Sequence, residues 1–318
     1  MLRDNRSPYM IEHDFWSRRR ILVTGGSGFL GSHLCKVLYQ LGAEVHATSR
    51  VERPSQQGGP IWWKSDLTGL EEVQSLLSKT RPDVVYHLAG SVGAKPDREL
   101  VLPTFKSLLF STLNLLIASS ELSCRRIILA GSLTEPKNQD SCPTPSSPYA
   151  AAKWAANGYG RMFHALYGTP TVILTPFMTF GPGQHPQKLI PSVILSLLKD
   201  EAPKLASGQW EADWIYVEDV VEAFLAAAQA RHIEGMHFDI GSGLKRSVRS
   251  IVELIVHQMG SRIRPAFGEL PDRPMEPIRV ADACHTSYKL GWECTTTLEK
   301  GLRQTIDWYA AHRQARMS

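Results

Sequence analysis

The sequence predicts an α/β fold built on a doubly wound parallel sheet, followed by a smaller C-terminal part. Three observations support this prediction. Short runs rich in Ile, Leu and Val alternate with amphipathic helical patterns, a spacing that is typical of parallel strands joined by crossover helices. The first of these runs ends in a glycine-rich turn that opens a helix. Beyond about residue 181 the alternation loosens into Pro-rich loops.

The elements follow in order after a polar tail, residues 1–17. RRRILVT (18–24) predicts a strand because it ends in consecutive apolar residues, and FLGSHLCKVLYQLG (29–42) predicts a helix because its apolar residues recur three and four apart. The same criteria place the other elements of a first domain, residues 18–180: strands at 43–50, 62–65, 82–90, 124–132 and within 169–183, and helices at 70–80, 100–122 and from 148 onward.

The rest of the chain is expected to divide between two domains. A segment near 212–242, with a strand, a helix and a second strand, is predicted to return to the first domain. Residues 181–211 and 243–318 are assigned to the second domain. It is expected to hold a helix near 189–199 and two helical segments around the Pro-rich stretch FGELPDRPMEP.

Composition excludes several classes of protein. The 318 residues are 43% hydrophobic and 21% charged with a net charge of +4, which is ordinary for a globular protein and indicates no nucleic-acid surface. No apolar run is expected to approach the roughly 20 residues that span a bilayer, and the N-terminus lacks the apolar core of a signal peptide. Five cysteines without CxxC spacing (35, 124, 142, 284 and 294) predict neither a disulfide framework nor a metal site. A cytoplasmic location is therefore expected.

The turn TGGSGFLG, residues 24–31, has the spacing of a dinucleotide-binding loop. Gly25 permits the tight turn, Gly28 lets the backbone approach a pyrophosphate, and Gly31 lets the helix pack on the strand. The start of the helix supplies amides and a positive dipole to the phosphates. The alternative is a purely structural strand–helix turn. The predicted cofactor-binding residues of this turn are Gly25, Ser27, Gly28, Phe29, Leu30 and Gly31.

The residues after the second strand indicate which dinucleotide binds. An acidic residue there would hold the ribose hydroxyls of NAD, whereas this chain has Ser49 and Arg50. A hydroxyl and a guanidinium suit a 2′-phosphate, so NADP(H) is predicted, with NAD(H) as the alternative. A solvated arginine at a strand end would explain Arg50 equally simply. Further cofactor contacts are predicted at Asp66, Leu67, Leu88, Ala89, Gly90, Tyr149, Lys153 and Pro176.

The stretch SPYAAAKWAA places Tyr149 and Lys153 one turn apart at the start of a helix. Ser146 or Ser147 can cap this helix, and Pro148 suits its first position. A lysine ammonium close to a phenol lowers the pKa of the tyrosine, which makes Tyr149 a candidate proton donor and acceptor. Taken alone, however, the pair is also compatible with an ordinary surface helix.

Together these motifs resemble the extended short-chain dehydrogenases and reductases, and within them the NAD(P)-dependent nucleotide-sugar epimerases, dehydratases and 4-ketoreductases. The resemblance extends over residues 15–310. It rests on the glycine turn, Asp66-Leu67, DVVYHLAG (83–90), Ser132, the Tyr149-x-x-x-Lys153 pair, and the later phrases FGPG (180–183), WIYVED (214–219) and LGW (290–292).

The resemblance implies a Rossmann-type domain followed by a substrate-binding domain, and it implies roles for three residues. Tyr149 would be the general acid and base for hydride transfer at a sugar hydroxyl or ketone. Lys153 would hydrogen-bond the nicotinamide ribose and lower the pKa of Tyr149. The hydroxyl of Ser132 would hold the substrate oxygen.

Several positions depart from the family pattern, and they bear on the substrate. Dehydratases of the family follow the catalytic hydroxyl with an acidic pair, whereas Leu133 and Thr134 follow Ser132 here and Glu135 comes one place late. Met178 replaces a common asparagine, Ala212 a common arginine, and an asparagine near Leu108 is also replaced. Arg273 resembles a retained phosphate-binding arginine, with a plain surface charge as the alternative. Substrate contacts are predicted at Thr134, Met178 and Arg273.

Three functions are consistent with this pattern. The first is NADPH-dependent reduction of the 4-keto group of a nucleotide-activated hexose, in particular a 6-deoxy hexose. The second is a nucleotide-sugar C4 epimerase with a retained cofactor, which the residues Ser49 and Arg50 disfavour. The third is a non-catalytic NADP-binding protein, which the presence of all three catalytic residue types disfavours. The apolar helix at 103–120 and the Tyr149 helix are expected to pair with their copies in a homodimer.

Overall fold

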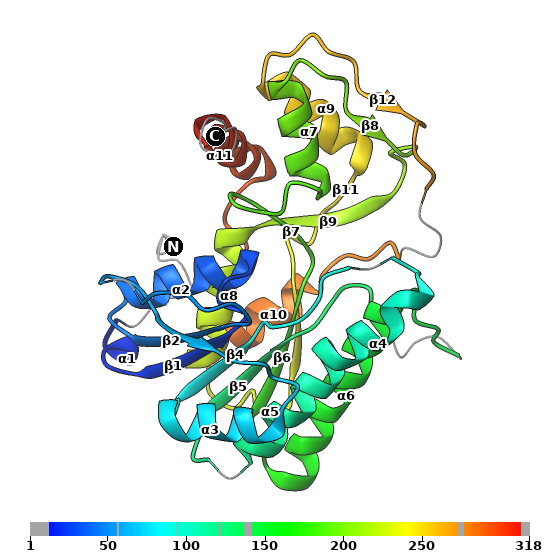
Figure 1. Cartoon of the computed structure of the whole chain (residues 1–318). Coiled ribbons are helices and arrows are strands. Elements are labelled where there is room, and N and C mark those ends of the chain that lie inside the picture. Colours follow the sequence, from blue (N-terminus) through cyan, green and yellow to red (C-terminus); the bar gives the residue numbers. More distant parts are fainter. Residues whose placement is uncertain are drawn as a thin grey trace, which may run out of the picture. The chain divides into compact units, whose positions relative to one another are not determined.

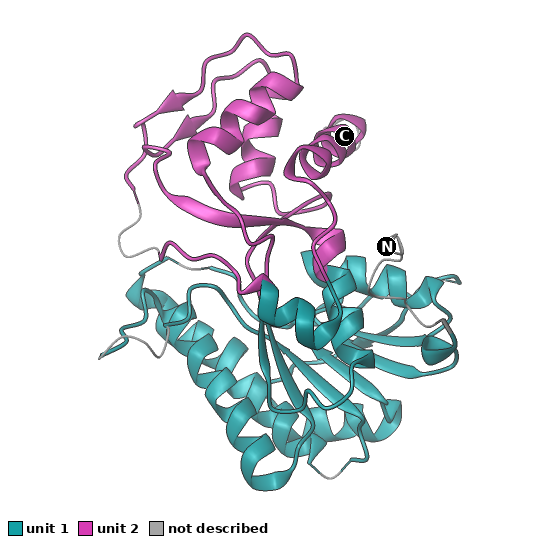
Figure 2. Ribbon diagram, turned by 180° about the vertical axis from the view of Figure 1, so that it is seen from behind, with its two compact units in different colours: residues 1–175, 221–239, 284–292 teal, residues 176–220, 240–283, 293–318 magenta. Residues whose placement is uncertain are grey.

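The computed structural model describes residues 13–55, 57–93, 95–120, 122–136, 142–272 and 277–312. The chain divides into two compact units (Figure 1; Figure 2). Unit 1 comprises residues 1–175, 221–239 and 284–292, and unit 2 comprises residues 176–220, 240–283 and 293–318. These bounds differ from the predicted domains. The returning segment is shorter than 212–242, and a second one, 284–292, had no signal in the sequence pattern.

Unit 1 is built on a seven-stranded sheet with the order β10-β6-β5-β4-β1-β2-β3. Adjacent pairs from β3 to β6 run parallel, which confirms the predicted fold class. The order reverses beside β1, whose neighbours are β2 and β4, and this reversal is where α/β proteins place ligands. The strands are β1 (Arg20–Thr24), β2 (Glu44–Ser49), β3 (Ile61–Lys64), β4 (Val84–His87), β5 (Arg126–Ala130), β6 (Thr171–Pro176) and β10 (His237–Ile240).

Helices cover both faces of this sheet (Figure 1). One face carries α3 (Leu70–Thr80), the helix that ends in α5 (Ser111–Ser119), and α6 (Pro148–Tyr167), which pack against one another in that order. The other carries α2 (Phe29–Gln40) and α8 (Val217–Gln229). On that face the Tyr86 hydroxyl donates to the Phe224 carbonyl of α8 at 3.2 Å. Helix α10 (Ala283–Leu290) lies almost entirely within the unit 1 segment 284–292.

One apolar cluster of unit 1 lies between the sheet and the helices α3 and α5 that cover one of its faces. Alternate residues of the strands point into it, and α3 contributes one apolar stripe, as period-two strands and amphipathic helices require. Its fully buried members include Leu22, Val73, Val85, Leu115 and Ile127. This packing holds the strand ends, and therefore the loops that follow them, in fixed positions.

A buried arginine ties β5 to the returning segment of the chain. Arg126 is 1% exposed, and its guanidinium donates to the carbonyls of Ala227 and Ala230 at 2.6 and 2.7 Å. It also forms an ion pair with Glu234. Burial lowers the pKa of Arg126 and Glu234 opposes this, so the ion pair keeps the guanidinium charged.

The predicted N-terminal tail is partly folded, which corrects the boundary at residue 17. Helix α1 (His13–Trp16) precedes β1, and the side chain of Trp16 is fully buried. A tryptophan buries more apolar area than any other side chain, so it anchors the segment despite its polar neighbours. Residues 1–12 lie outside the described part of the chain.

The apolar helix predicted at 100–122 spans residues 98–119 and is not uniform. It runs through η1 (Arg98–Leu100), α4 (Val101–Thr104), a π-helical stretch η2 (Phe105–Phe110) and α5. The helix has 22 residues, and an 18-residue window within it has a mean hydropathy of 1.6, which corrects the expectation that no apolar run reaches the length of a membrane span. The helix packs on α3 and α6, and Leu108, Leu115 and Leu116 are buried, so it is a layer of the α/β fold.

The described residues of unit 2 form two small sheets and three helices. One sheet has the order β11-β9-β7, with β7 (Met178–Phe180), β9 (Glu211–Tyr216) and β11 (Lys245–Ser247). The other pairs β8 (Lys204–Leu205) with β12 (Ala266–Phe267). The helices are α7 (Leu189–Leu198), α9 (Val248–Gln258) and α11 (Leu298–Ala311). Beyond residue 245 the described chain therefore has three helices, α9, α10 and α11, where the sequence predicted two.

Candidate active site

The glycine turn joins β1 to α2 at the carboxyl edge of the sheet. Gly25 has a φ of +69°, and a Cβ on it would lie 2.8 Å from the Cα of Ala89. A Cβ on Gly31 would lie 2.3 Å from the Gly25 carbonyl oxygen. Both positions therefore need glycine, one for its backbone conformation and both for the close approach of neighbouring backbone. Gly28 donates its amide to the Gly25 carbonyl at 2.9 Å and directly precedes α2.

The start of α2 has the form of a phosphate cradle. Gly28 is the N-cap, and no side chain in the described chain caps this helix. The backbone amides of Phe29 and Leu30, at the start of the helix, therefore donate no hydrogen bond to a capping side chain. Ser27 lies in the turn before them. Amides and dipole together favour a negatively charged group at this point. These residues fit the pyrophosphate of a dinucleotide.

The end of β2 lies beside this turn. Thr48 accepts a hydrogen bond from the Gly25 amide at 3.2 Å, which fixes the turn to the strand. Ser49 is 8% exposed and accepts from the Val51 amide at 3.2 Å, whereas the side chain of Arg50 is exposed. Arg53 adds a second cation that sequence reasoning missed, with its guanidinium 5.3 Å from the ring centre of Trp62.

The other predicted cofactor residues lie in the loops after β3 and β4. Asp66 is exposed, and its Oδ1 accepts from the amide and hydroxyl of Thr68 at 3.0 and 2.9 Å. Leu67 is buried, and its carbonyl accepts from Asn114 of α5 at 3.0 Å. Leu88 and Ala89 follow β4, and Gly90 has a φ of +144° with Leu108 occupying the space of a Cβ.

A buried histidine connects these loops. His87 Nδ1 is 2.8 Å from the Thr24 hydroxyl, which also accepts from the Ala89 amide, and His87 Nε2 is 3.0 Å from the Thr112 hydroxyl. Burial and then the positive charge of Lys153 lower the pKa of His87 to about 3. The ring is therefore neutral at physiological pH and acts as a hydrogen-bonded spacer between β1, β4 and α5.

Helix α6 forms as predicted and carries Tyr149 and Lys153 on its first turns. Ser147 is the N-cap and accepts from the Ala150 amide at 3.2 Å, with Pro148 at the first position. Ser132, two residues after β5, hydrogen-bonds with the Tyr149 side chain and lies 2.9 Å from the Thr134 hydroxyl. The structure thus brings the predicted Ser132 and Tyr149 together at the carboxyl end of β5.

Lys153 lies one turn after Tyr149 on α6 and is nearly buried. Its side chain is 8% exposed, and Nζ donates to the carbonyl of Ala130 at 2.7 Å. Burial lowers the pKa of Lys153 to about 8, and the negative charge of Glu135 acts in the opposite direction. An ammonium has three donors, so the bond to Ala130 leaves two for other partners.

The expected effect of Lys153 on Tyr149 is corrected by the structure. The pKa of Tyr149 is raised above its ordinary value, first by burial and also by Glu135, while the hydrogen bond with Ser132 partly opposes this rise. The sequence argument considered only the lysine one turn away. It could not include the loss of water around the phenol or the carboxylate of Glu135.

Glu135 is a further residue whose place in the site sequence reasoning missed. It was noted only because it fails to match the acidic pair of the dehydratases, yet its side chain is 7% exposed. One carboxylate oxygen accepts from the Ser132 amide at 2.5 Å, and both accept from the Asn157 amide at 2.8 and 2.9 Å. An acidic residue three positions after a predicted strand-end serine was the signal available in the sequence.

The predicted substrate residues are spread over both units. Thr134 of unit 1 is half-buried beside Ser132. Met178 of unit 2 begins β7 and is half-buried. Pro176, which was predicted as a cofactor contact, ends β6. Arg273 lies outside the described residues.

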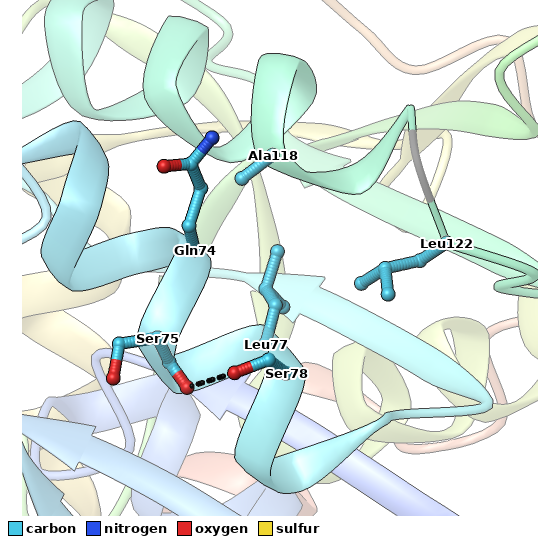
Figure 3. A pocket seen from close by; sticks show the side chains of 6 residues that line it. All are labelled: Gln74, Ser75, Leu77, Ser78, Ala118 and Leu122. Carbon is cyan, nitrogen blue, oxygen red and sulfur yellow. Dashed lines mark hydrogen bonds between the residues drawn. The ribbon is translucent and has the colours of Figure 1, made fainter.

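Two further features of the described chain carry no site chemistry. A shallow pocket of about 340 Å³ lies beside α3 and α5, and Figure 3 shows its lining. Its side chains are uncharged, none is a predicted site residue, and the Ser78 hydroxyl bonds the Ser75 carbonyl. Among the described residues no group of histidine, cysteine and acidic side chains could hold a metal ion. All five cysteines are free.

Comparison with known proteins identifies the class. The model of the NAD dependent epimerase/dehydratase family matches residues 21–241, more than half of the chain. The chain belongs to this family.

Individual relatives include both dehydratases and epimerases. A dTDP-glucose 4,6-dehydratase of Haemophilus influenzae is 28% identical over 91% of this chain and 97% of its own. Among solved structures, a UDP-glucose 4-epimerase of Thermotoga maritima with UDP-glucose is 25% identical, with a TM-score of 0.84 over 92% of this chain and 99% of that one. A UDP-glucuronic acid 4-epimerase of Bacillus cereus, in complex with UDP-glucuronic acid and NAD, is 25% identical, with a TM-score of 0.82 over the same shares.

Proposed function

We propose that this enzyme uses NADPH to reduce the 4-keto group of a nucleotide-activated hexose, with 6-deoxy hexoses as the first substrates to test. The carrying observation is the placement of the Tyr149 side chain in hydrogen-bond contact with Ser132 at the carboxyl end of β5, with Lys153 one turn further along α6. The Tyr149 phenol is protonated at neutral pH, so it can give its proton to the oxygen of a ketone that is being reduced.

The residues have separate tasks in this reaction. A bound NADPH supplies the hydride that reaches C4 of the sugar. Tyr149 donates its hydroxyl proton to the former carbonyl oxygen, and the Ser132 hydroxyl holds that oxygen in line. Lys153, charged at pH 7, offers its free donors to the nicotinamide ribose and stabilises the negative charge left on Tyr149. Thr134, Met178 and Arg273 are proposed as substrate contacts.

A dehydratase is disfavoured by the loop after β5. Leu133 is buried and apolar, and Thr134 carries a hydroxyl, so neither can act as the acidic pair for elimination of water. The carboxylate of Glu135 already accepts hydrogen bonds from Ser132 and Asn157. Both interactions hold Glu135 within the protein, so this carboxylate is not placed to remove a proton from the substrate.

A C4 epimerase is the second candidate, because epimerases with bound nucleotide sugars are among the similar solved structures. It would use the same three residues with a cofactor that stays bound. A non-catalytic NADP-binding protein is the third, and Ser132, Tyr149 and Lys153 together count against it.

The test is NADPH oxidation by purified protein with 4-keto-6-deoxyhexoses carried on dTDP, UDP, GDP and CDP. Stoichiometric oxidation with one carrier is expected, and it would also name the nucleotide. Interconversion of C4 epimers without net oxidation, by protein that retains its cofactor through purification, would replace the reductase by the epimerase.

Arg50 is proposed to select NADP(H) over NAD(H). Arg50→Ala should weaken NADPH binding about 10- to 100-fold, since a charge-assisted hydrogen bond contributes about 1.5–3 kcal/mol, and should leave NADH binding nearly unchanged. Fluorescence titration with both nucleotides measures this difference. Lys79→Ala, which removes a charge from the last turn of α3, serves as the control. Equal losses for NADPH and NADH would contradict a role in selecting the 2′-phosphate.

We also propose a homodimer formed through the helix at 98–119 and α6. These helices expose large apolar side chains: Val101, Leu102, Phe105, Phe110, Ile117, Tyr159, Leu166 and Tyr167. Light scattering should give twice the chain mass of 35.4 kDa, and Phe105→Asp should shift it toward the monomer. Tyr288→Asp, which alters an exposed residue of α10, should leave it unchanged. A wild-type mass of one chain would refute the dimer.

A further inference from the structure

Glu135 is a buried carboxylate directly behind the proposed catalytic serine. Its 7% exposure is unusual for a glutamate, because a buried charge is costly unless it is hydrogen-bonded and paired. The structure supplies the bonds, from the Ser132 amide at 2.5 Å and from Asn157 at 2.8 and 2.9 Å. This geometry fixes the backbone of Ser132.

Asn157 brings α6 into the same cluster. It is 2% exposed and lies one turn beyond Lys153 on the helix that also carries Tyr149. Its amide nitrogen reaches both oxygens of Glu135. A Cβ on Gly131 would lie 3.0 Å from both Glu135 Oε1 and Asn157 Nδ2, so the backbone of the loop also packs tightly against this pair. The loop after β5 and the catalytic helix are thereby joined.

The cluster also contains two opposite charges, the Glu135 carboxylate and the Lys153 ammonium. Lys153 is buried; Glu135 from the loop raises its pKa, and Lys153 in turn lowers the pKa of His87 from β4. Tyr149 from the same helix is the third titratable group of the cluster, and its pKa responds to Glu135. His87 is neutral, and Tyr149 keeps its proton. Glu135 is therefore the negative charge that compensates for the Lys153 ammonium.

We propose that Glu135, held by Asn157, is a positioning residue that aligns the Ser132 hydroxyl with Tyr149 and keeps Lys153 charged. The roles of Ser132, Tyr149 and Lys153 in this inference rest on the proposed function. The electrostatic link between Glu135 and Lys153 does not, and it can be measured without any substrate.

The primary experiment follows Lys153 by NMR in protein labelled with ¹³C at the lysine Cε, with the signal assigned by Lys153→Met. The wild-type midpoint is expected near pH 8. Glu135→Gln, which keeps the shape of the side chain but removes its charge, should lower this midpoint by about one unit or more. Glu71→Gln, an exposed change on α3, should not move it. An unchanged midpoint in Glu135→Gln would overturn the electrostatic part of the proposal.

A charge exchange separates electrostatics from loss of structure. The double variant Glu135→Gln with Asn157→Asp puts the carboxylate on α6 and the amide on the loop. The introduced glutamine can still accept from the Ser132 amide and can donate to the new carboxylate. The midpoint of Lys153 should return to near pH 8. Failure to return in a folded double variant would count against the proposal, and this variant carries the test if Glu135→Gln alone does not fold.

Activity provides the second readout. Once a substrate is known, the alkaline limb of the kcat profile should move to lower pH in Glu135→Gln, by the same amount as the NMR midpoint, and should be restored in the double variant. A merely structural role would lower kcat at every pH without moving the limb, and that result would overturn the proposal. Absence of activity with any keto sugar, together with the expected NMR shifts, would refute the proposed function while supporting the link between Glu135 and Lys153.

Discussion

Tyr149→Phe is expected to lower the rate of keto-sugar reduction by about 10³-fold, within the range of 10²–10⁴ that positioned general acids contribute. The variant removes one oxygen atom, the one that hydrogen-bonds with Ser132 and carries the proton for the substrate. Because the ring remains, the packing at the start of α6 should be preserved. The measurement is kcat for NADPH oxidation.

Binding separates this loss from misfolding. The affinity for NADPH should change by less than about threefold, since the lost hydroxyl lies at the proton-transfer step and the phosphate cradle is formed by other residues. Tyr159→Phe changes a more exposed tyrosine of the same helix and should retain full activity. A Tyr149→Phe enzyme with wild-type kcat would assign proton transfer to another group.

Gly31→Ala is expected to abolish detectable binding of the dinucleotide, a loss of at least about 100-fold. The new Cβ would lie 2.3 Å from the Gly25 carbonyl oxygen and 2.9 Å from the Gly26 Cα, and both neighbours are backbone. Backbone cannot swing aside as a flexible side chain can, so the turn must open and the amides that face the phosphates must move. Overpacking of this kind also costs about 1–3 kcal/mol of stability. Titration with NADPH and thermal unfolding measure the two effects.

Gly158→Ala provides the matched control. This glycine lies within α6, and an added Cβ would meet only the Arg161 side chain at 3.9 Å. Alanine favours a helix interior over glycine, so the variant should bind NADPH normally and gain about 0.5–1 kcal/mol of stability. Normal binding by Gly31→Ala as well would mean that the dinucleotide does not lie on this turn.

The features that the sequence predicted are those determined by local chemistry. The TGGSGFLG turn follows from glycine spacing between an apolar run and a helical pattern. Helix α6 follows from the order of serine, proline and alanine at its start. Burial patterns of the parallel strands are equally local, which is why the order of elements through β6 was predictable before any contact was known.

The features that it missed depend on residues that are distant in sequence. The role of Glu135 depends on its contact with Asn157, which lies 22 positions later in the sequence. The pKa of Tyr149 is set by burial and by that same carboxylate. Trp16 was assigned to a tail because its neighbours are polar, although a single large apolar side chain suffices to anchor a short helix.

The path of the chain through the two units has a practical consequence for anyone who wishes to divide the protein. A fragment ending near residue 180 would contain every residue proposed for proton transfer. It would lack β10, the edge strand of the seven-stranded sheet, and the carbonyls of Ala227 and Ala230 that accept from Arg126. It would also expose Tyr86, which packs on Phe224. The cofactor-binding half is therefore completed only after about 290 residues have been synthesised. Neither a gene truncated at the apparent domain boundary nor a half-synthesised chain should yield an autonomous nucleotide-binding module.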